Sequence, residues 1–212
     1  MKGIHPNFNY EYFQNQTNKI QNKSDNQIEQ SNLTNFAVYE NVFTSYELKK
    51  IIDMCRLSKK EKGKVPFIVD LSYRSSNISW IDKNTENKWI YDRINHIIDH
   101  ANNKFWKFNL SNKHEAIQFG EYNAKEKGHY DWHLDMANNN NNRKLSMSIQ
   151  LSDPSEYTGG ELQFLTNREI RAAPKKRGSM IIFPSYLLHK VSSVKTGKRM
   201  SLVMWRHGPN FK

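Results

Sequence analysis

A histidine and an aspartate stand two residues apart near the middle of the chain, at His133 and Asp135, with Leu134 between them. On an extended strand, side chains alternate between two faces, so residues two apart point in the same direction. An imidazole and a carboxylate on one side offer two ligands to a metal ion. An isolated His-x-Asp sequence is common in proteins, so a metal site needs a further ligand elsewhere in the chain.

We expect His189 to complete this site. It follows Phe183-Pro184-Ser185 on a later segment that the fold can bring back beside the first pair. Two histidines and one carboxylate, with the remaining positions open, are the ligands of non-haem Fe(II) oxygenases. The histidines bind as neutral imidazoles and the aspartate as a carboxylate, so the site forms readily near neutral pH. Other divalent first-row metals accept the same ligands, so the pattern does not identify the metal.

Other histidines fit a metal site less well. His96 and His100 have the four-residue spacing of a helical zinc pair, but they lie off the apolar stripe of a predicted helix, as on a solvated face. His129 and His133 have the same spacing, but a glycine and two aromatic residues nearby oppose a helix there. His207 lacks a partner pattern.

A cation and a hydroxyl follow the third ligand, at Arg199 and Ser201. Arginine offers a planar, permanently charged fork to a carboxylate, and Ser201 points to the same face of a strand. Together they could hold the far carboxylate of a dicarboxylic keto acid whose other end reaches the metal. Tyr122, on the preceding strand, is a candidate third hydrogen-bond donor. Leu162 and Val191 are candidate apolar walls.

The length of 212 residues suffices for one domain with a full hydrophobic core and a tail. Cys55 is the single cysteine, which excludes a disulfide framework and a cysteine metal site. We expect no signal peptide and no membrane span, because no apolar run approaches the roughly 18 residues of a span. These features predict a cytoplasmic protein, whose reducing surroundings suit ferrous iron.

The chain is basic, with 32 Lys and Arg against 21 Asp and Glu, a net charge of +11. A basic balance favours acidic partners such as nucleic acid. The basic residues are scattered and do not form one block, so the Lys- and Asn-rich composition typical of an AT-rich genome explains the charge better. Nucleic acid therefore stays a possible partner and is not the favoured one.

Composition divides the chain into a flexible N-terminal segment, 1–35, and a folded domain, 36–212. The first segment is rich in Asn, Gln, Ser and Lys from residue 14 onward, and such a sequence buries little surface. Thr44 and Glu47 have the spacing of a capping box before a first helix. Apolar residues at helical spacing predict a second helix over 84–104.

Short strands at regular spacing occupy most of the remaining chain. Residues 145–152 alternate strictly between apolar and polar side chains, which predicts a half-buried strand. Gly159-Gly160 predicts a hairpin turn before 161–165, and the asparagine run 138–142 predicts a loop. The other predicted strands are 36–39, 65–71, 73–81, 116–122, 129–136, 168–172, 180–183, 189–194 and 199–205. The pattern predicts a mainly β protein with N-terminal helices (α+β), built as a double-sheet jelly roll.

With these residues in place, the chain resembles the 2-oxoglutarate and Fe(II)-dependent oxygenases, in particular their prolyl 4-hydroxylase-like (PKHD-type) branch. The resemblance covers about 36–212 and is strongest from 117 on. It rests on five segments: His133-Leu134-Asp135, 145–152, Gly159-Gly160-Glu161-Leu162, Phe183-Pro184-Ser185 and 189–205.

The resemblance implies a cupin-like double-stranded β-helix. The residues that it implies are the iron ligands His133, Asp135 and His189, the 2-oxoglutarate contacts Arg199, Ser201 and Tyr122, and the substrate-flanking Arg143 and Trp205. It also implies hydroxylation of a C–H bond with release of succinate and CO2. The favoured substrate is a prolyl residue in a peptide or protein. Ascorbate is a further candidate cofactor.

Some features depart from the family pattern. Tyr122 stands farther from His133 than is usual, and the asparagine run is not a family feature. The carboxylate ligand argues against the halogenating relatives, which lack it. Arg206 is one residue out of register with the second arginine of the nucleic-acid demethylases. The alternatives left open are the same chemistry on nucleic acid or a small molecule, and a binding module without turnover.

Overall fold

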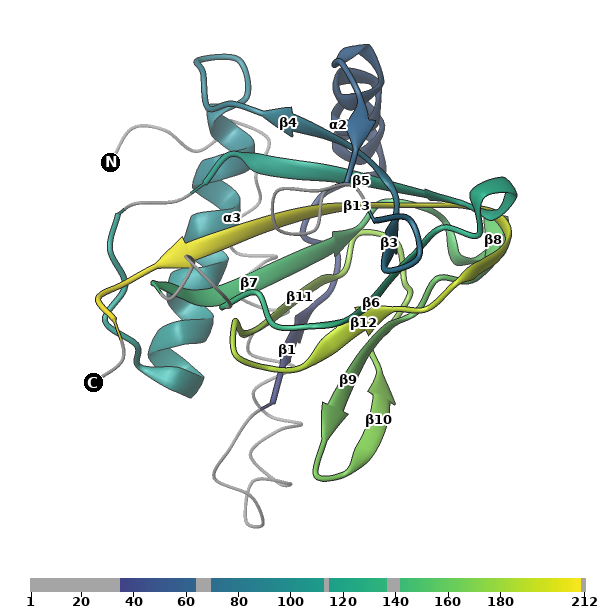
Figure 1. Cartoon of the computed structure of the whole chain (residues 1–212). Coiled ribbons are helices and arrows are strands. Elements are labelled where there is room, and N and C mark those ends of the chain that lie inside the picture. Colours follow the sequence, from purple (N-terminus) through teal and green to yellow (C-terminus); the bar gives the residue numbers. More distant parts are fainter. Residues whose placement is uncertain (1–34, 64–69, 113–114, 137–141, 211–212) are drawn as a thin grey trace. The chain divides into compact units, whose positions relative to one another are not determined.

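The computed structural model describes residues 35–63, 70–112, 115–136 and 142–210 (Figure 1). These residues fall into two compact units. One is Lys83–Lys107, and the other joins Asn35–Asp82 to the described residues from Phe108 onward. The predicted boundary between 1–35 and 36–212 stays a prediction, because residues 1–34 lie outside the described residues. No helix in the described ranges is both long enough and apolar enough to cross a bilayer.

Helix α2 (Ser45–Leu57) begins with the predicted capping box. The Thr44 side chain accepts a hydrogen bond from the backbone N–H of Glu47 at 3.2 Å, and the Glu47 carboxylate accepts one from the backbone N–H of Thr44 at 2.9 Å. Two backbone N–H groups without a helical partner are thereby satisfied. The predicted apolar face is buried.

Helix α3 (Lys88–Ala101) and the π-helical turn η1 (Asn102–Trp106) form the unit Lys83–Lys107. The helix begins four residues later than predicted because Asn84 and Asn87 make a turn instead. Each side-chain oxygen accepts a hydrogen bond from the other residue's backbone N–H, at 2.9 and 3.0 Å. His96 and His100 are exposed on the helix, as predicted.

The larger unit contains the described strands, arranged as two antiparallel sheets. The strands of the first sheet, in spatial order, are β1 (Ala37–Tyr39), β11 (Met180–Pro184), β7 (Arg143–Gln150), β13 (Val194–His207), β5 (Ile117–Asn123), β4 (Asn77–Ile81) and β2 (Glu61–Lys62), with β8 (Tyr157–Gly159) paired to β13. Those of the second are β10 (Glu169–Ala172), β9 (Leu162–Thr166), β12 (His189–Val191), β6 (His129–His133) and β3 (Arg74–Ser75). Short 3-10 turns, η2 (Ala124–Glu126) and η3 (Pro154–Glu156), connect some of them. This is the predicted jelly roll (Figure 1).

Apolar side chains from both sheets meet in the interior. Phe164 of β9 packs edge-on against Phe183 of β11, with ring centroids 4.8 Å apart. Phe183 also packs against the imidazole of His189, at 4.7 Å. The hydrophobic core therefore extends to the predicted metal ligands and supports one of them from behind.

The strand predicted at 73–81 is two strands that belong to different sheets. Arg74–Ser75 pairs with β6 in the second sheet, and Asn77–Ile81 pairs with β5 in the first. Ser76 lies at the corner between them. A sequence pattern of period two continues through such a corner, so it gave no sign of the change of sheet. Residues 64–69 and 137–141 lie outside the described residues, so most of the strand predicted at 65–71 and of the loop at 138–142 is untested.

Two further predictions about strands were wrong. Strand β7 is buried on both faces rather than half-buried, because its polar side chains face the interior between the sheets. Gly159 and Gly160 have φ of 70° and 61°, a region that glycine adopts without strain. However, β8 pairs with β13 rather than with β9, so the predicted hairpin does not form.

Candidate metal centre and keto acid site

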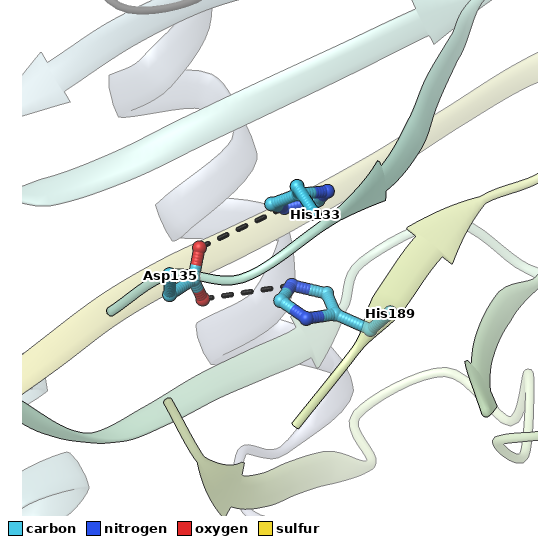
Figure 2. A group of neighbouring side chains, drawn as sticks. All are labelled: His133, Asp135 and His189. Atoms are coloured by element: carbon cyan, nitrogen blue, oxygen red, sulfur yellow. Dashed lines mark ion pairs between the residues drawn. The ribbon is translucent and has the colours of Figure 1, made fainter. Parts of the chain in front are cut away.

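The three predicted ligands converge on one point (Figure 2). His133 Nε2 lies 3.7 Å from Asp135 Oδ1, and His189 Nε2 lies 3.5 Å from Asp135 Oδ2. One ligand atom of each residue lies within 4.8 Å of the others. Neighbouring ligand atoms around an ion with bonds of about 2.1 Å are separated by roughly 3 Å, so a small shift would bring all three onto a first-row metal.

Strand pairing explains how the two histidines meet. His133 ends β6 and His189 begins β12, and the two residues are direct partners in the antiparallel register. Asp135 does not lie on the strand, as the alternation argument assumed, but in a bend beyond its end. This bend is fixed where the backbone N–H of Met136 donates to the carbonyl of Ser185 at 3.0 Å. The bend turns the carboxylate back toward both imidazoles.

Backbone carbonyls set the proton positions on the two imidazoles. Nδ1 of His133 lies 2.7 Å from the carbonyl oxygen of Asp131, and Nδ1 of His189 lies 2.8 Å from that of Leu187. A carbonyl oxygen only accepts, so Nδ1 carries the hydrogen in each ring, which leaves Nε2 as the lone-pair nitrogen of the neutral imidazole. Both lone pairs then point toward the carboxylate of Asp135. A cation between these acceptors would satisfy them, which is the arrangement of a histidine metal ligand.

Burial favours the metal-binding protonation states. Desolvation, together with the nearby His189, lowers the pKa of His133 to about 3, so this imidazole is neutral at pH 7. Burial acts to raise the pKa of Asp135, but the adjacent histidines and a hydrogen bond from Ser146 lower it below the usual range. The carboxylate is therefore ionised. No proton has to be removed from these two residues before a metal binds.

Arg199 is buried, with 1% of its surface exposed. Its Nη1 donates to the hydroxyl of Ser201 and its Nη2 to the side-chain oxygen of Gln150, both at 3.2 Å. Nε has no hydrogen-bond partner, and no carboxylate within the described ranges lies at ion-pairing distance. Leaving a charge buried and unpaired is costly. The site therefore fits an anion, as predicted for the far carboxylate of a keto acid.

Tyr122 lies beside this arginine. The two residues are direct partners in the register of β5 and β13, and the guanidinium carbon lies 5.4 Å from the centroid of the tyrosine ring. Tyr122 and Val191 are buried in one small cluster, whereas Leu162 belongs to the core shared with Phe164. The positions agree with the predicted hydrogen-bond donor and apolar walls, whose roles stay predictions.

The residues predicted to flank a substrate also meet. The guanidinium carbon of Arg143 lies 3.9 Å above the Trp205 ring, and Nη1 of Arg143 donates to the carbonyl of Asp135 at 3.4 Å. His207 does have a partner, because its Nε2 lies 3.0 Å from Glu115 Oε1. No metal-ligating group among the described residues includes His207, in agreement with the lack of such a pattern in the sequence.

Sequence reasoning missed several residues that shape the site. Tyr130 stacks on His133 with ring centroids 3.6 Å apart, and the Arg74 guanidinium carbon lies over the Tyr130 ring, 4.5 Å from its centroid. Gln150 and Ser146 lie on the polar side of β7. The alternation of that strand was the available signal, but its polar face was predicted to face solvent rather than the interior of the jelly roll.

Residues 117–207 match the family model of the 2OG-Fe(II) oxygenase superfamily. The match agrees with the fold and with the three converging ligands. Among solved structures, a prolyl-4-hydroxylase from Pseudomonas putida matches with a TM-score of 0.68 and 20% identity, over 82% of this chain and 92% of that one. A prolyl hydroxylase from Trichoplax adhaerens, in complex with a hypoxia inducible factor peptide fragment, matches with a TM-score of 0.75 and 14% identity, over 95% and 94%. Likenesses at these identities show the fold alone.

The curated relatives that this chain matches include PKHD-type hydroxylases. One from Prochlorococcus marinus is 39% identical over 99 residues, which cover 46% of this chain and 44% of the relative. Another from Crocosphaera subtropica is 33% identical over 110 residues, which cover 50% and 49%. The matches thus span about half the length of these relatives.

Proposed function

We propose that the chain is a 2-oxoglutarate- and Fe(II)-dependent dioxygenase that hydroxylates a C–H bond of a prolyl residue in a peptide or protein. One observation carries the proposal: three metal-ligating residues converge on one point, and the described residues offer no carboxylate partner to the buried Arg199. A metal ion and a dicarboxylate would satisfy these two unpaired features together. The PKHD-type relatives and the prolyl hydroxylase folds support the choice of substrate.

The residues divide into those that hold the metal and those that hold the co-substrate. His133, Asp135 and His189 would bind Fe(II) on one side and leave positions open on the other. When bound, Fe(II) supplies the oxidative chemistry in which one oxygen atom enters the substrate while 2-oxoglutarate and O2 yield succinate and CO2. Arg199 and Ser201 would receive the far carboxylate of 2-oxoglutarate, because the guanidinium fork and the hydroxyl face the same side of β13.

Positioning is the protein's main contribution to this chemistry. The carbonyls of Asp131 and Leu187 fix the ligand imidazoles, and the buried interior keeps bulk water from the ionised carboxylate of Asp135. Trp205, held under Arg143, offers an aromatic surface that would pack against an apolar ring of the substrate.

The test is oxidation of a peptide library by the purified protein with Fe(II), 2-oxoglutarate and O2, with ascorbate added as a reductant. We expect prolyl peptides to gain one oxygen by mass spectrometry, with one succinate formed for each hydroxylated product. The Asp135→Ala variant provides the control. Succinate formation that survives in this variant would refute the ligand assignment. Succinate formation by the wild type with no oxidised prolyl peptide would refute the substrate.

A further inference from the structure

Glu115 was not among the predicted site residues, yet its carboxylate holds Arg143, which together with Trp205 would form one wall of the substrate site. Oε1 accepts a hydrogen bond from Nε of Arg143 at 2.6 Å, and Oε2 accepts one from Nη2 at 2.5 Å. Nε2 of His207 lies 3.0 Å from the same Oε1. Two parallel bonds between an arginine and a carboxylate fix the plane of the guanidinium as well as its position.

The guanidinium of Arg143, held in this plane, also contacts two other residues of the site. Arg143 lies over the Trp205 ring at 3.9 Å and reaches the carbonyl of the metal ligand Asp135 with Nη1. The side chains of Arg143 and Glu115 are only 12% and 28% exposed, so solvent screens their attraction incompletely. The carboxylate of Glu115 therefore offsets the charge of Arg143 at close range. A substrate would meet a flat ion pair there rather than a free cation.

We infer that Glu115 is a positioning residue that sets the charge preference of the substrate site. By holding Arg143 flat and neutralised, it favours an uncharged group beside the metal ligands, such as a prolyl ring in a neutral sequence. It disfavours an anionic group, such as a phosphate or an acidic side chain, which would meet the carboxylate of Glu115 instead of an available cation. This inference rests on the proposed function, because it takes Arg143 and Trp205 as the substrate wall.

The Glu115→Gln variant tests the inference, because it removes the negative charge and keeps the size of the side chain. Its matched control is Glu126→Gln, which removes an exposed carboxylate that pairs with Lys62 at 2.8 Å. The first measurement is the NMR signal of the Arg143 Nε–H, identified by its absence in Arg143→Lys. We expect this hydrogen to be protected from exchange in the wild type and the control, and to lose protection in Glu115→Gln.

The second measurement is selectivity between two peptides that differ in one residue beside the proline, asparagine in one and aspartate in the other. In Glu115→Gln the preference for the neutral peptide, measured as the ratio of kcat/KM values, is expected to fall roughly tenfold, mainly through KM. Glu115→Asp keeps the charge but shortens its reach. It is expected to show an intermediate loss of selectivity, and it decides the question if the glutamine variant does not fold.

Unchanged selectivity in the Glu115 variants overturns the inference, whether or not the Nε–H protection is lost. Retained protection in Glu115→Gln also overturns it, since Glu115 would then not be what holds Arg143. A wild-type protein that oxidises no prolyl peptide refutes the proposed function instead. In that case the exchange measurement still decides whether Glu115 positions Arg143.

Discussion

Replacement of Arg199 by methionine should change stability and ligand binding in opposite directions. The arginine is 1% exposed, and its partners are neutral side chains, those of Ser201, Gln150 and Tyr157, so the protein without ligand bears the cost of a buried charge. Methionine keeps most of the aliphatic stem and removes that charge. Apolar replacement of a buried ion pair is often neutral or stabilising by about 1–4 kcal/mol, and Arg199 carries the cost of burial with no carboxylate in the described ranges to offset it. We expect Arg199→Met to be more stable by about 1 kcal/mol, which raises Tm by about 2–4 °C in a chain of this size.

The same change should remove most of the affinity for 2-oxoglutarate. Hydrogen bonds to charged groups contribute about 1.5–3 kcal/mol each. Loss of two such bonds therefore costs at least about 3 kcal/mol, or roughly a hundredfold in Kd. In the wild type loaded with Mn(II), 2-oxoglutarate at about 100 times its Kd should add about 2.7 kcal/mol of stability. In the variant this ligand-dependent rise in Tm should be lost.

The assay is thermal unfolding with and without 2-oxoglutarate, together with calorimetric titration of the ligand. Arg171→Met is the matched control, because Arg171 is about half exposed and pairs at 3.5 Å with Glu169 on the same strand. We expect this control to bind 2-oxoglutarate as the wild type does. An Arg199→Met protein that binds 2-oxoglutarate with wild-type affinity would show that the buried cation does not receive the keto acid. A variant less stable than the wild type by more than about 2 kcal/mol would show that the charge is not a burden in the free protein.

Three further predictions concern other parts of the structure. Asp135→Ala should weaken Mn(II) binding at least roughly tenfold, measured by calorimetry without substrate, since it removes a carboxylate from the ligand set; wild-type affinity would contradict the assignment. Gly197→Ala should lower the free energy of unfolding by about 2–4 kcal/mol in denaturant titration, because φ is +68° and a Cβ would meet the carbonyl oxygen of Glu156 at 1.9 Å; an unchanged midpoint would contradict this. Burial acts to raise the pKa of Glu121, but hydrogen bonds from two lysines hold it below its ordinary value. Its ion pairs therefore stabilise the fold at pH 7, and that contribution is lost as the pH falls through the lowered pKa. Glu121→Gln should be less stable than the wild type by about 1 kcal/mol at pH 7, a difference that should shrink below pH of about 4 and would be unexplained if it persisted there.

Local sequence patterns predicted the elements and the residue types of the site, because these depend on spacing along the chain. The two-residue spacing of His133 and Asp135 predicted that their side chains lie together, and they do, although Asp135 reaches its place through a bend rather than through strand alternation. The capping box before α2 was predicted correctly because it involves only four consecutive residues.

What the sequence did not show depends on contacts between distant segments. Glu115, just before β5, and Arg143, at the start of β7, are 28 residues apart and meet only because these two strands belong to the same sheet. Likewise, Gln150 belongs to an alternating strand whose polar side chains were assigned to solvent. Periodicity tells which side chains share a face, but not whether that face looks outward or into a second sheet.

Strand β13 fixes the distance between two parts of the proposed active site. Arg199, Ser201 and Trp205 are an even number of residues apart, so one uninterrupted strand sets the separation between the anchor for the keto acid and the aromatic wall, about 20 Å at roughly 3.3 Å per residue. Deleting a single residue between positions 201 and 205 would turn the indole to the opposite side of the sheet while leaving the anchor in place. Changes of length in this protein are therefore expected to accumulate in its connecting loops, whereas the spacing between these two positions stays constant.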